Sequence, residues 1–208
     1  MHGKLLFKYG PMSSGKSLHL LATAHNFQRS SIPFVIFKSG IDNRDGEGMI
    51  HSRALGNREC ITIGENNDLY ELISEYIENC FFIGNEKPKW ILVDECQFLT
   101  EKQVDQLAAI ADIHGINIIC YGLRTDFRTK LFPGSKRLFE IADSFEEIKS
   151  SCPCGSKSIF NARIDGNGNL LLEGNQIEIG GDEKYIALCR KCYFEKSRKE
   201  KYFKEKGN

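Results

Sequence analysis

The stretch GPMSSGKS at residues 10–17 decides the fold of this chain. It fits the pattern G-x-x-x-x-G-K-[S/T], whose fixed positions are Gly10, Gly15, Lys16 and Ser17. Apolar residues 5–7 precede the stretch and a helical pattern follows it, which is the context that a phosphate-binding loop requires. Its glycines let successive backbone N–H groups turn toward phosphate oxygens, and the helix adds the positive end of its dipole. The stretch therefore predicts an α/β domain that binds ATP or GTP.

Two carboxylates complete the chemistry that this loop predicts. Asp94 and Glu95 directly follow the apolar run of residues 90–93, and nucleotides bind at the edge where parallel strands end. Ser17 and Asp94 suit Mg²⁺, and Glu95 is left to act as a base. The alternatives are a glycine-rich turn without a ligand and a Glu95 that only caps the next turn. We expect the following loop residues to contact the nucleotide: Gly10, Pro11, Met12, Ser13, Ser14, Gly15, Lys16 and Ser17.

Strand and helix patterns alternate from the N-terminus to about residue 143, which predicts a parallel sheet covered by helices. We expect a P-loop, RecA-like α/β domain over residues 1–150. Its predicted strands are 5–7, 34–37, 60–63, 90–93 and 116–121, and its predicted helices are 17–29, 69–77 and 100–114. Thr100, followed by Gln103, predicts the start of the last helix. Residues 39–59 are polar with little periodicity, and we expect a long, mobile, functional loop there.

The chain changes character after residue 150. Two close cysteine pairs appear, formed by Cys152 with Cys154 and Cys189 with Cys192. Four thiolates suit tetrahedral Zn²⁺, and a closed shell of four sulfurs makes the site structural. A disulfide or a metal-free cluster is the alternative, and the first pair is shorter than the usual C-x-x-C. We expect a small zinc-ribbon or lasso module over residues 151–193, then a basic tail over 194–208 that is a solvated helix or a frayed end.

Composition limits the class of protein. The 208 residues carry 28 Lys and Arg against 28 Asp and Glu, which argues against binding nucleic acid along the whole surface. Apolar runs are too short for a membrane span or a signal peptide, so we expect a cytoplasmic protein with no membrane partner. The other four cysteines stand beside apolar runs, as buried free thiols do: Cys60, Cys80, Cys96 and Cys120.

Five motifs, in this order, resemble those of the small, zinc-containing thymidine kinases. They are GPMSSGKS (10–17), VDECQF (93–98), CYGLRTDFR (120–128), IGGDEKY (179–185) and CRKC (189–192). The resemblance extends from Lys4 to Tyr193. It implies transfer of the γ-phosphate of ATP to the 5′-hydroxyl of thymidine, with Mg²⁺ on the nucleotide and a structural Zn²⁺. Glu95 matches the family's general base, and Asp94 matches its magnesium-linked aspartate.

The resemblance also implies roles that spacing alone does not assign. Asp42 and Arg44 match a pair near the phosphates and metal, and the nucleotide-contacting stretch includes Cys96 and Gln97. The implied pocket for the thymine base consists of Met12, Phe98, Leu123, Phe127, Ile177, Ile179, Gly180 and Tyr185. Phe127 would offer its ring to the base, and the 177–181 segment its backbone. A homotetramer and inhibition by thymidine triphosphate are further implications.

Several of these residues also admit a purely structural interpretation. Phe98 and Leu123 adjoin apolar strands and fit a hydrophobic core, whereas Phe127 fits one less well because its neighbours are polar. Arg124 and Arg128 hold phosphate or pair with a nearby carboxylate, so we leave both outside the predicted site. Two other functions compete: a P-loop ATPase whose zinc ribbon binds nucleic acid, and a nucleotide-binding regulator without catalysis. A phosphorylated nucleoside product distinguishes the kinase from both.

Overall fold

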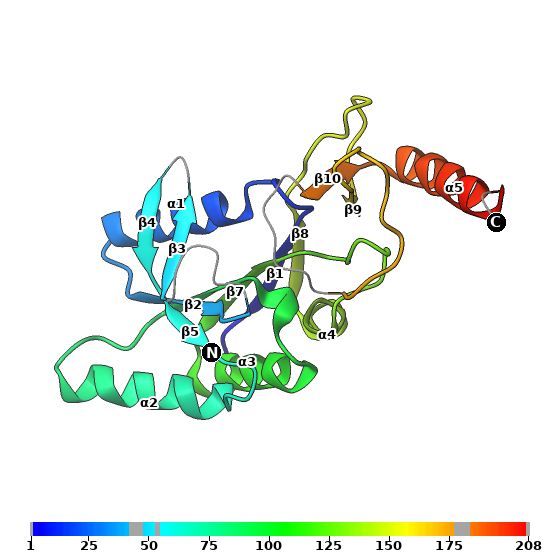
Figure 1. Cartoon of the computed structure of the whole chain (residues 1–208). Helices are drawn as coiled ribbons and strands as arrows, with labels where there is room; N and C mark the ends of the chain where they lie inside the picture. Colours follow the sequence, from blue (N-terminus) through cyan, green and yellow to red (C-terminus); the bar gives the residue numbers. More distant parts are fainter. Residues whose placement is uncertain (1, 42–47, 53–54, 177–183, 207–208) are drawn as a thin grey trace.

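The computed structural model describes residues 2–41, 48–52, 55–176 and 184–206, and its centre is a parallel β-sheet (Figure 1). Six strands lie in the order β5-β2-β6-β7-β1-β8, and each neighbouring pair is parallel. The strands are β1 (Leu5–Tyr9), β2 (Phe34–Ser39), β5 (Ile61–Ile63), β6 (Trp90–Asp94), β7 (Asn117–Gly122) and β8 (Ser144–Glu147). The predicted α/β fold is confirmed, and β8 is a strand that the sequence analysis did not predict.

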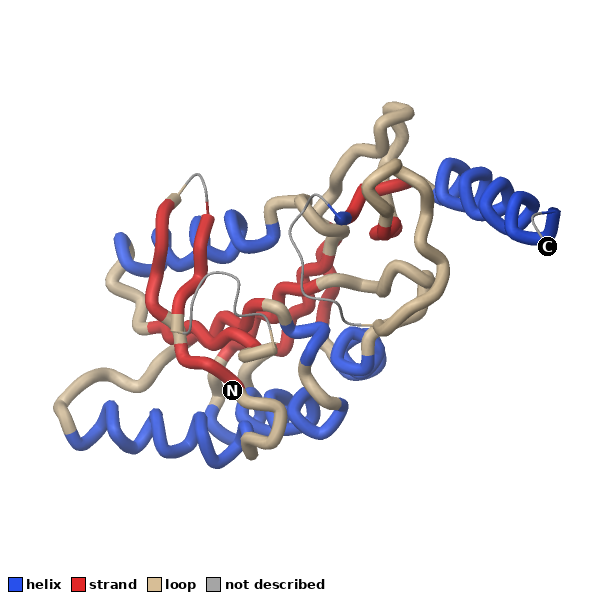
Figure 2. Tube along the Cα trace, viewed as in Figure 1, coloured by secondary structure: helices blue, strands red, loops and turns tan. Residues whose placement is uncertain are grey.

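Helices cover both faces of the sheet (Figure 2). They are α1 (Lys16–Arg29), α2 (Leu69–Phe82), α3 (Glu101–His114) and α4 (Pro133–Ile141), with a short 3₁₀ turn η1 (Cys96–Phe98) after β6. On one face, α1 contributes Leu20 and Ala24 to a buried cluster with alternate residues of the central strands. On the other face, α2, α3 and α4 contribute Ile73, Leu107 and Leu138 to a larger cluster. The sheet is therefore the middle of three layers.

The central strands are apolar along their length because both of their faces are covered. In β6, Ile91 and Val93 join the cluster under α2–α4, while Leu92 joins the cluster under α1. Full burial of such a side chain contributes about 1.5–3 kcal/mol relative to exposure. β6 begins at Trp90, whose ring centroid lies 5.1 Å from that of Phe27 in α1, and ends at Asp94. β6 thus places the carboxylate of Asp94 at the edge of the sheet where β1 ends and the phosphate-binding loop begins.

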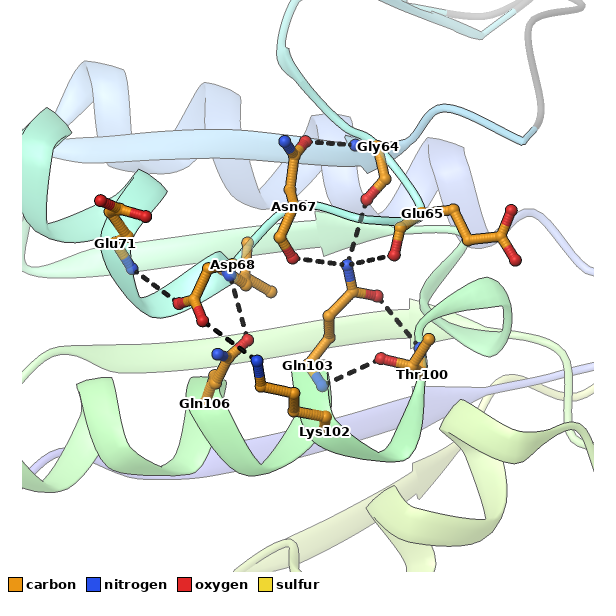
Figure 3. Close-up of polar contacts among 10 residues, drawn as sticks. Gly64, Glu65, Asn67, Asp68, Glu71, Thr100, Lys102, Gln103 and Gln106 are labelled. Carbon is orange, nitrogen blue, oxygen red and sulfur yellow. Dashed lines mark hydrogen bonds and ion pairs between the residues drawn. The ribbon is translucent and has the colours of Figure 1, made fainter.

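Figure 3 shows how the start of α3 is fixed to the segment that joins β5 to α2. Gln103 N donates to Thr100 Oγ1 and Thr100 N donates to Gln103 Oε1, each at 3.1 Å, so the predicted cap is confirmed. Gln103 Nε2 donates to the carbonyl oxygens of Gly64 at 3.1 Å and Asn67 at 3.2 Å. Since Gln103 is buried, its amide is a buried polar link between the start of α3 and the segment that leads into α2.

Replacing Gln103 by leucine is expected to lower the free energy of unfolding by about 2 kcal/mol. Leucine has a similar volume but leaves the Thr100 N–H and the Gly64 and Asn67 carbonyls without this partner. Urea unfolding followed by circular dichroism measures the change. Asp112→Asn, on the exposed face of the same helix, is the control and should stay within about 0.5 kcal/mol of wild type. Equal midpoints for Gln103→Leu and wild type would contradict the assigned role.

The structure corrects the prediction of a long loop over residues 39–59. β3 (Met49–Ser52) and β4 (Gly56–Glu59) form an antiparallel hairpin in which Ile50 lies opposite Arg58. Ile50 is completely buried in the cluster under α1. Strands of four residues are too short to show a period, and Met49 and Ile50 are the only apolar residues of β3. The sequence pattern of this segment therefore predicts a loop, whereas tertiary packing folds the segment into a hairpin.

The four-cysteine module, residues 151–193, has a small core of its own. β9 (Phe160–Arg163) pairs antiparallel with β10 (Tyr185–Leu188), and α5 (Arg190–Lys206) follows. Ala162, Leu170, Leu188 and Tyr193 are buried together in this module. The basic tail forms part of α5, and the domain boundaries at residues 150 and 193 stay predictions.

In the described part of the chain, no helix has the length and apolar character that crossing a membrane requires.

Candidate active site

The loop between β1 and α1 has the backbone of a phosphate-binding loop. Gly15 has a positive φ of 83° immediately before α1, a conformation that glycine adopts without steric cost. At Gly10, a Cβ atom would lie 2.5 Å from both Ile148 O and Ser14 Oγ, so the close approach requires glycine. Lys16 is buried, and its Nζ donates to Pro11 O at 2.9 Å. The ammonium group therefore lies over the loop, where such loops present their lysine to phosphate.

Ser17 and Asp94 meet at the edge of the sheet although they are far apart in sequence. Ser17 Oγ donates to Asp94 Oδ2 at 3.2 Å, and Asp94 is 2% exposed. Burial, and next the negative charge of Glu95, raise the pKa of Asp94 to about 7, while Lys16 and Lys38 act in the opposite direction. A hydroxyl beside a carboxylate is an oxygen donor pair of the kind that Mg²⁺ prefers.

Lys38 is a site residue that the sequence analysis missed. It lies in β2 directly opposite Asp94 of β6, so their side chains share one face of the sheet. Lys38 is 4% exposed, and its Nζ donates to Met49 O at 3.4 Å. A buried ammonium is costly unless charged and polar groups surround it. The sequence does hold a signal, because Lys38 stands at the end of an otherwise apolar strand.

Glu95 is held in a strained conformation directly after β6. Its φ of 54° and ψ of 36° are left-handed, which is uncommon for a residue with a side chain and clusters at functional sites. Gln97, which is 0% exposed, donates from Nε2 to Glu95 Oε2. The same amide accepts from Leu123 N through Oε1 at 3.0 Å. Gln97 therefore orients the carboxylate and ties it to the loop after β7.

Gly122, at the end of β7, makes room for this arrangement. A Cβ atom there would lie 2.6 Å from Gln97 Oε1 and 2.6 Å from Cys96 Sγ. Gly122 O also accepts from Gly10 N at 3.2 Å, which connects β7 to the phosphate-binding loop. One glycine thus lies between the phosphate-binding loop and the residue that orients Glu95.

The structure describes five of the residues expected to line a base pocket, and two of them, Leu123 and Phe127, lie in the loop after β7. Phe98 and Leu123 are half-buried, and Phe98 lies edge-on to Phe132 with ring centroids 5.8 Å apart. Met12 N donates to Asn161 Oδ1 at 2.6 Å, and Tyr185 begins β10. The predicted positions outside the described residues are Asp42, Arg44, Ile177, Ile179 and Gly180.

Phe127 is buried, with 2% of its surface exposed. The guanidinium of Arg163 lies 4.9 Å from its ring centroid, and that of Arg128 lies 5.6 Å away. Both guanidinium groups thus lie over the Phe127 ring in this structure. The stacking role of Phe127 therefore stays a prediction, and both arginines belong to its surroundings, although the sequence analysis left Arg128 outside the site.

The four late cysteines come together as Cys152, Cys154, Cys189 and Cys192. Their Sγ atoms all lie within 4.8 Å of one another, and the Cys154 and Cys189 sulfurs are 3.7 Å apart. Thiolates on a tetrahedral ion with bonds of about 2.3 Å lie about 3.8 Å apart. Hydrogen bonds, first from Ser156, lower the pKa of the Cys154 thiol to about 6, whereas hydrogen bonds with Cys154 and Cys189 raise the pKa of Cys192 to about 12. The cluster fits a metal site.

The remaining cysteines behave as expected for structural thiols. Cys80, Cys96 and Cys120 are buried, while Cys60 is half-buried. All eight cysteines lie in the described residues, and none forms a disulfide. The disulfide alternative for the late cysteines is therefore not observed.

Comparison with known proteins assigns this arrangement to a family. A family model described as thymidine kinase matches residues 3–193. This chain belongs to the thymidine kinase family. A thymidine kinase of Shouchella clausii (strain KSM-K16) is 42% identical over 191 residues, which cover 91% of this chain and 95% of that protein. One of Zymomonas mobilis is 43% identical over 194 residues, covering 93% and 97%. One of Rhizobium meliloti is 42% identical over 195 residues, covering 94% and 98%.

The thymidine kinase match includes every part of the candidate site. Residues 3–193 contain the phosphate-binding loop, the Asp94–Glu95 pair, the loop after β7 and the four cysteines. Most of α5 lies beyond Tyr193 and so outside the family model. The resemblance drawn from five motifs is thus confirmed at the level of the family.

Proposed function

We propose that this chain transfers the γ-phosphate of ATP to the 5′-hydroxyl of thymidine, giving thymidine monophosphate and ADP. The observation that carries the proposal is the Ser17–Asp94 hydrogen bond of 3.2 Å, which joins the phosphate-binding loop to the strand end that bears Glu95. Membership of the thymidine kinase family supports thymidine as the acceptor. A P-loop ATPase would use the same carboxylate pair, so it is the family membership that favours the kinase over the competing functions.

Phosphate binding falls to the loop of residues 10–17. Its backbone N–H groups and Lys16 bind the phosphates, and Lys16 already lies over the loop. Ser17 and Asp94 are the residues that would hold Mg²⁺, and their oxygen donors fit this ion. When bound, Mg²⁺ supplies charge neutralisation to the transferring phosphate. The carboxylate of Asp94 is buried and oriented by two donors, Ser17 Oγ at 3.2 Å and Glu95 N at 3.0 Å.

Glu95 is the proposed general base. Its carboxylate takes the proton from the nucleoside hydroxyl as that oxygen attacks phosphorus, while the β-phosphate oxygen leaves with the ADP. Glu95 has a left-handed backbone directly after β6, and Gln97 Nε2 donates to one of its carboxylate oxygens. A base positioned in this way contributes about 10²–10⁴-fold to the rate.

The substrate pocket is proposed to lie beside the loop after β7. Met12, Phe98, Leu123, Phe127 and Tyr185 are its candidates among the described residues, and the resemblance adds Asp42, Arg44, Ile177, Ile179 and Gly180. By the same resemblance we propose a cytoplasmic homotetramer that thymidine triphosphate inhibits. Sedimentation and an activity assay with added thymidine triphosphate test these two properties separately.

Product analysis tests the activity. The protein is incubated with ATP, Mg²⁺ and one nucleoside at a time: thymidine, deoxyuridine, deoxycytidine, deoxyadenosine or deoxyguanosine. Chromatography is expected to show thymidine monophosphate and an equal amount of ADP. ADP formed without any nucleoside monophosphate would overturn the proposal, and stimulation of that hydrolysis by nucleic acid would favour the ATPase alternative.

Zinc is the proposed ion of the four-cysteine cluster, since a closed shell of four thiolates is typical of structural Zn²⁺. Cys189→Ser is expected to abolish bound zinc and to lower the melting temperature, because this sulfur also accepts from Cys192 N at 3.5 Å. Metal analysis by mass spectrometry and differential scanning fluorimetry measure both effects. Cys80→Ser, which changes a buried thiol outside the cluster, should retain zinc. One zinc per chain in Cys189→Ser would contradict the assignment.

A further inference from the structure

Three consecutive residues of the loop after β7 are hydrogen-bonded to the four-cysteine module. Thr125 O accepts from Asn161 Nδ2 of β9 at 3.1 Å. Phe127 O accepts from the hydroxyl of Tyr193 in α5 at 2.6 Å. Between them, Asp126 Oδ2 accepts from Gln176 Nε2 at 3.2 Å. The peptide that carries Phe127 is therefore held by three different segments of the module.

Asp126 is the centre of this connection. Its side chain is 0% exposed, and Oδ1 accepts from the backbone N–H groups of Arg128 at 2.9 Å and Lys130 at 2.8 Å. Oδ2 accepts from Arg128 Nε at 3.2 Å and Nη2 at 3.1 Å, besides Gln176. A carboxylate at this depth is stable only with such a set of donors. The two backbone hydrogen bonds to Oδ1 stabilise the turn that follows Asp126. The hydrogen bonds to Oδ2 connect this turn to the side chains of Arg128 and Gln176.

The bonds to Oδ2 act on the surroundings of Phe127. Arg128, which Asp126 holds, has its guanidinium 5.6 Å from the centroid of the Phe127 ring. Arg128 Nη1 also donates to Gly174 O at 3.4 Å, close to the Gln176 that Asp126 binds. The Asp126 carboxylate thus binds both Gln176 and the guanidinium that lies over the Phe127 ring. The contacts of Glu95 with Gln97 and of Ser17 with Asp94 involve none of these groups.

We propose that Asp126 is a positioning residue for the nucleoside. It fixes the Phe127 ring and residues 174–176 relative to each other, and so it sets the affinity for the nucleoside more than the rate of phosphoryl transfer. The proposal rests on the proposed function, in which the ring of Phe127 faces the base. A loop that is ordered before binding does not have to lose that freedom when the substrate arrives. Weakening its attachment therefore raises the KM for thymidine.

Gln176→Met is the first test, because it removes one donor to Asp126 and leaves the carboxylate paired with Arg128. We expect the KM for thymidine to rise about tenfold, as a hydrogen bond to a charged group is lost. The kcat and the KM for ATP should stay within about twofold of wild type, because the phosphate-binding loop is untouched. Asp126→Asn should raise the KM for thymidine further, since the pairing with Arg128 also weakens.

Asp105→Asn is the matched control, because it changes an exposed aspartate that pairs with Arg137 on the surface. Asp105→Asn should leave kcat, the KM for thymidine and the KM for ATP unchanged. In the double variant of Asp126→Asn with Gln176→Met, we expect the KM for thymidine of Asp126→Asn alone, since both changes remove the same contact. Steady-state kinetics with either substrate varied give every value.

An unchanged KM for thymidine in Gln176→Met would overturn the positioning role, as would a fall in kcat with both KM values unchanged. If Asp126→Asn fails to fold, Gln176→Met decides alone, with its melting temperature and zinc content as checks. Failure of the proposed function is distinguishable, because the wild-type protein would then yield no thymidine monophosphate.

Discussion

Glu95→Gln is expected to lower kcat for thymidine phosphorylation by about 10²–10⁴-fold. Glutamine keeps the size of the side chain and its place in the left-handed turn after β6, but its amide cannot accept the hydroxyl proton. The bond from Gln97 Nε2 can still reach the amide oxygen, so the surrounding structure is expected to persist. Binding of ATP and thymidine should change little, because neither substrate loses a required partner in its ground state.

Rapid-quench measurement of a single turnover isolates the chemical step of this variant. Isothermal titration with ATP and with thymidine measures the two affinities independently. Glu75→Gln, the same substitution on the exposed face of α2, is the matched control and should be fully active. Activity of Glu95→Gln within a factor of ten of wild type would remove Glu95 from the role of general base.

Gly122→Ala is expected to lower kcat by about 10²-fold, although residue 122 supplies no functional side chain. The added methyl group would lie 2.6 Å from Gln97 Oε1 and 2.6 Å from Cys96 Sγ, so Gln97 must move. Movement of Gln97 displaces the carboxylate of Glu95 and the Leu123 N–H that the same amide binds. Overpacking at this point is also expected to destabilise the fold by about 1–3 kcal/mol.

Kinetics measured below the unfolding transition give the loss of kcat in Gly122→Ala without a contribution from unfolding. Urea unfolding measures the loss of stability. Gly166→Ala is the matched control, because a Cβ at that position meets no atom within 4 Å. Double substitution with Gln97→Ala provides a further check. If Gly122→Ala acts through Gln97, the loss of activity in the double variant equals the loss in Gln97→Ala. A fully active Gly122→Ala would show that Gln97 tolerates displacement.

The parts of the molecule that the sequence predicts are those in which local pattern and tertiary structure agree. The strand at Ile91–Val93 is apolar because helices cover both faces, and Thr100 with Gln103 caps a helix wherever it stands. The phosphate-binding loop has the same character, since Gly15 is required by a backbone conformation that the motif specifies. The sequence motifs assign Ser17 and Asp94 to the same ion, and the structure brings their oxygen atoms to 3.2 Å.

The parts that escape prediction depend on contacts between distant segments. Ile50 shows no pattern, yet it is buried under α1 and makes a hairpin of a segment that resembles a loop. Asn161 and Tyr193 resemble ordinary residues of a small module, and their hydrogen bonds to the Phe127 loop arise only when the module folds against it. Asp126 stands two residues before Arg128 in sequence, and only the structure shows that it also binds Gln176.

The position of the single tryptophan determines what optical methods can detect in this protein. Trp90 lies at the first residue of β6 and Asp94 at its last, so about 13 Å of extended backbone separates the indole from the catalytic edge. Because the indole lies against Phe27, its emission should respond strongly when heat or urea disrupts the layers. Addition of ATP should leave that emission almost unchanged. Intrinsic fluorescence therefore monitors unfolding, whereas occupancy of the site calls for calorimetry or a nucleotide that carries its own dye.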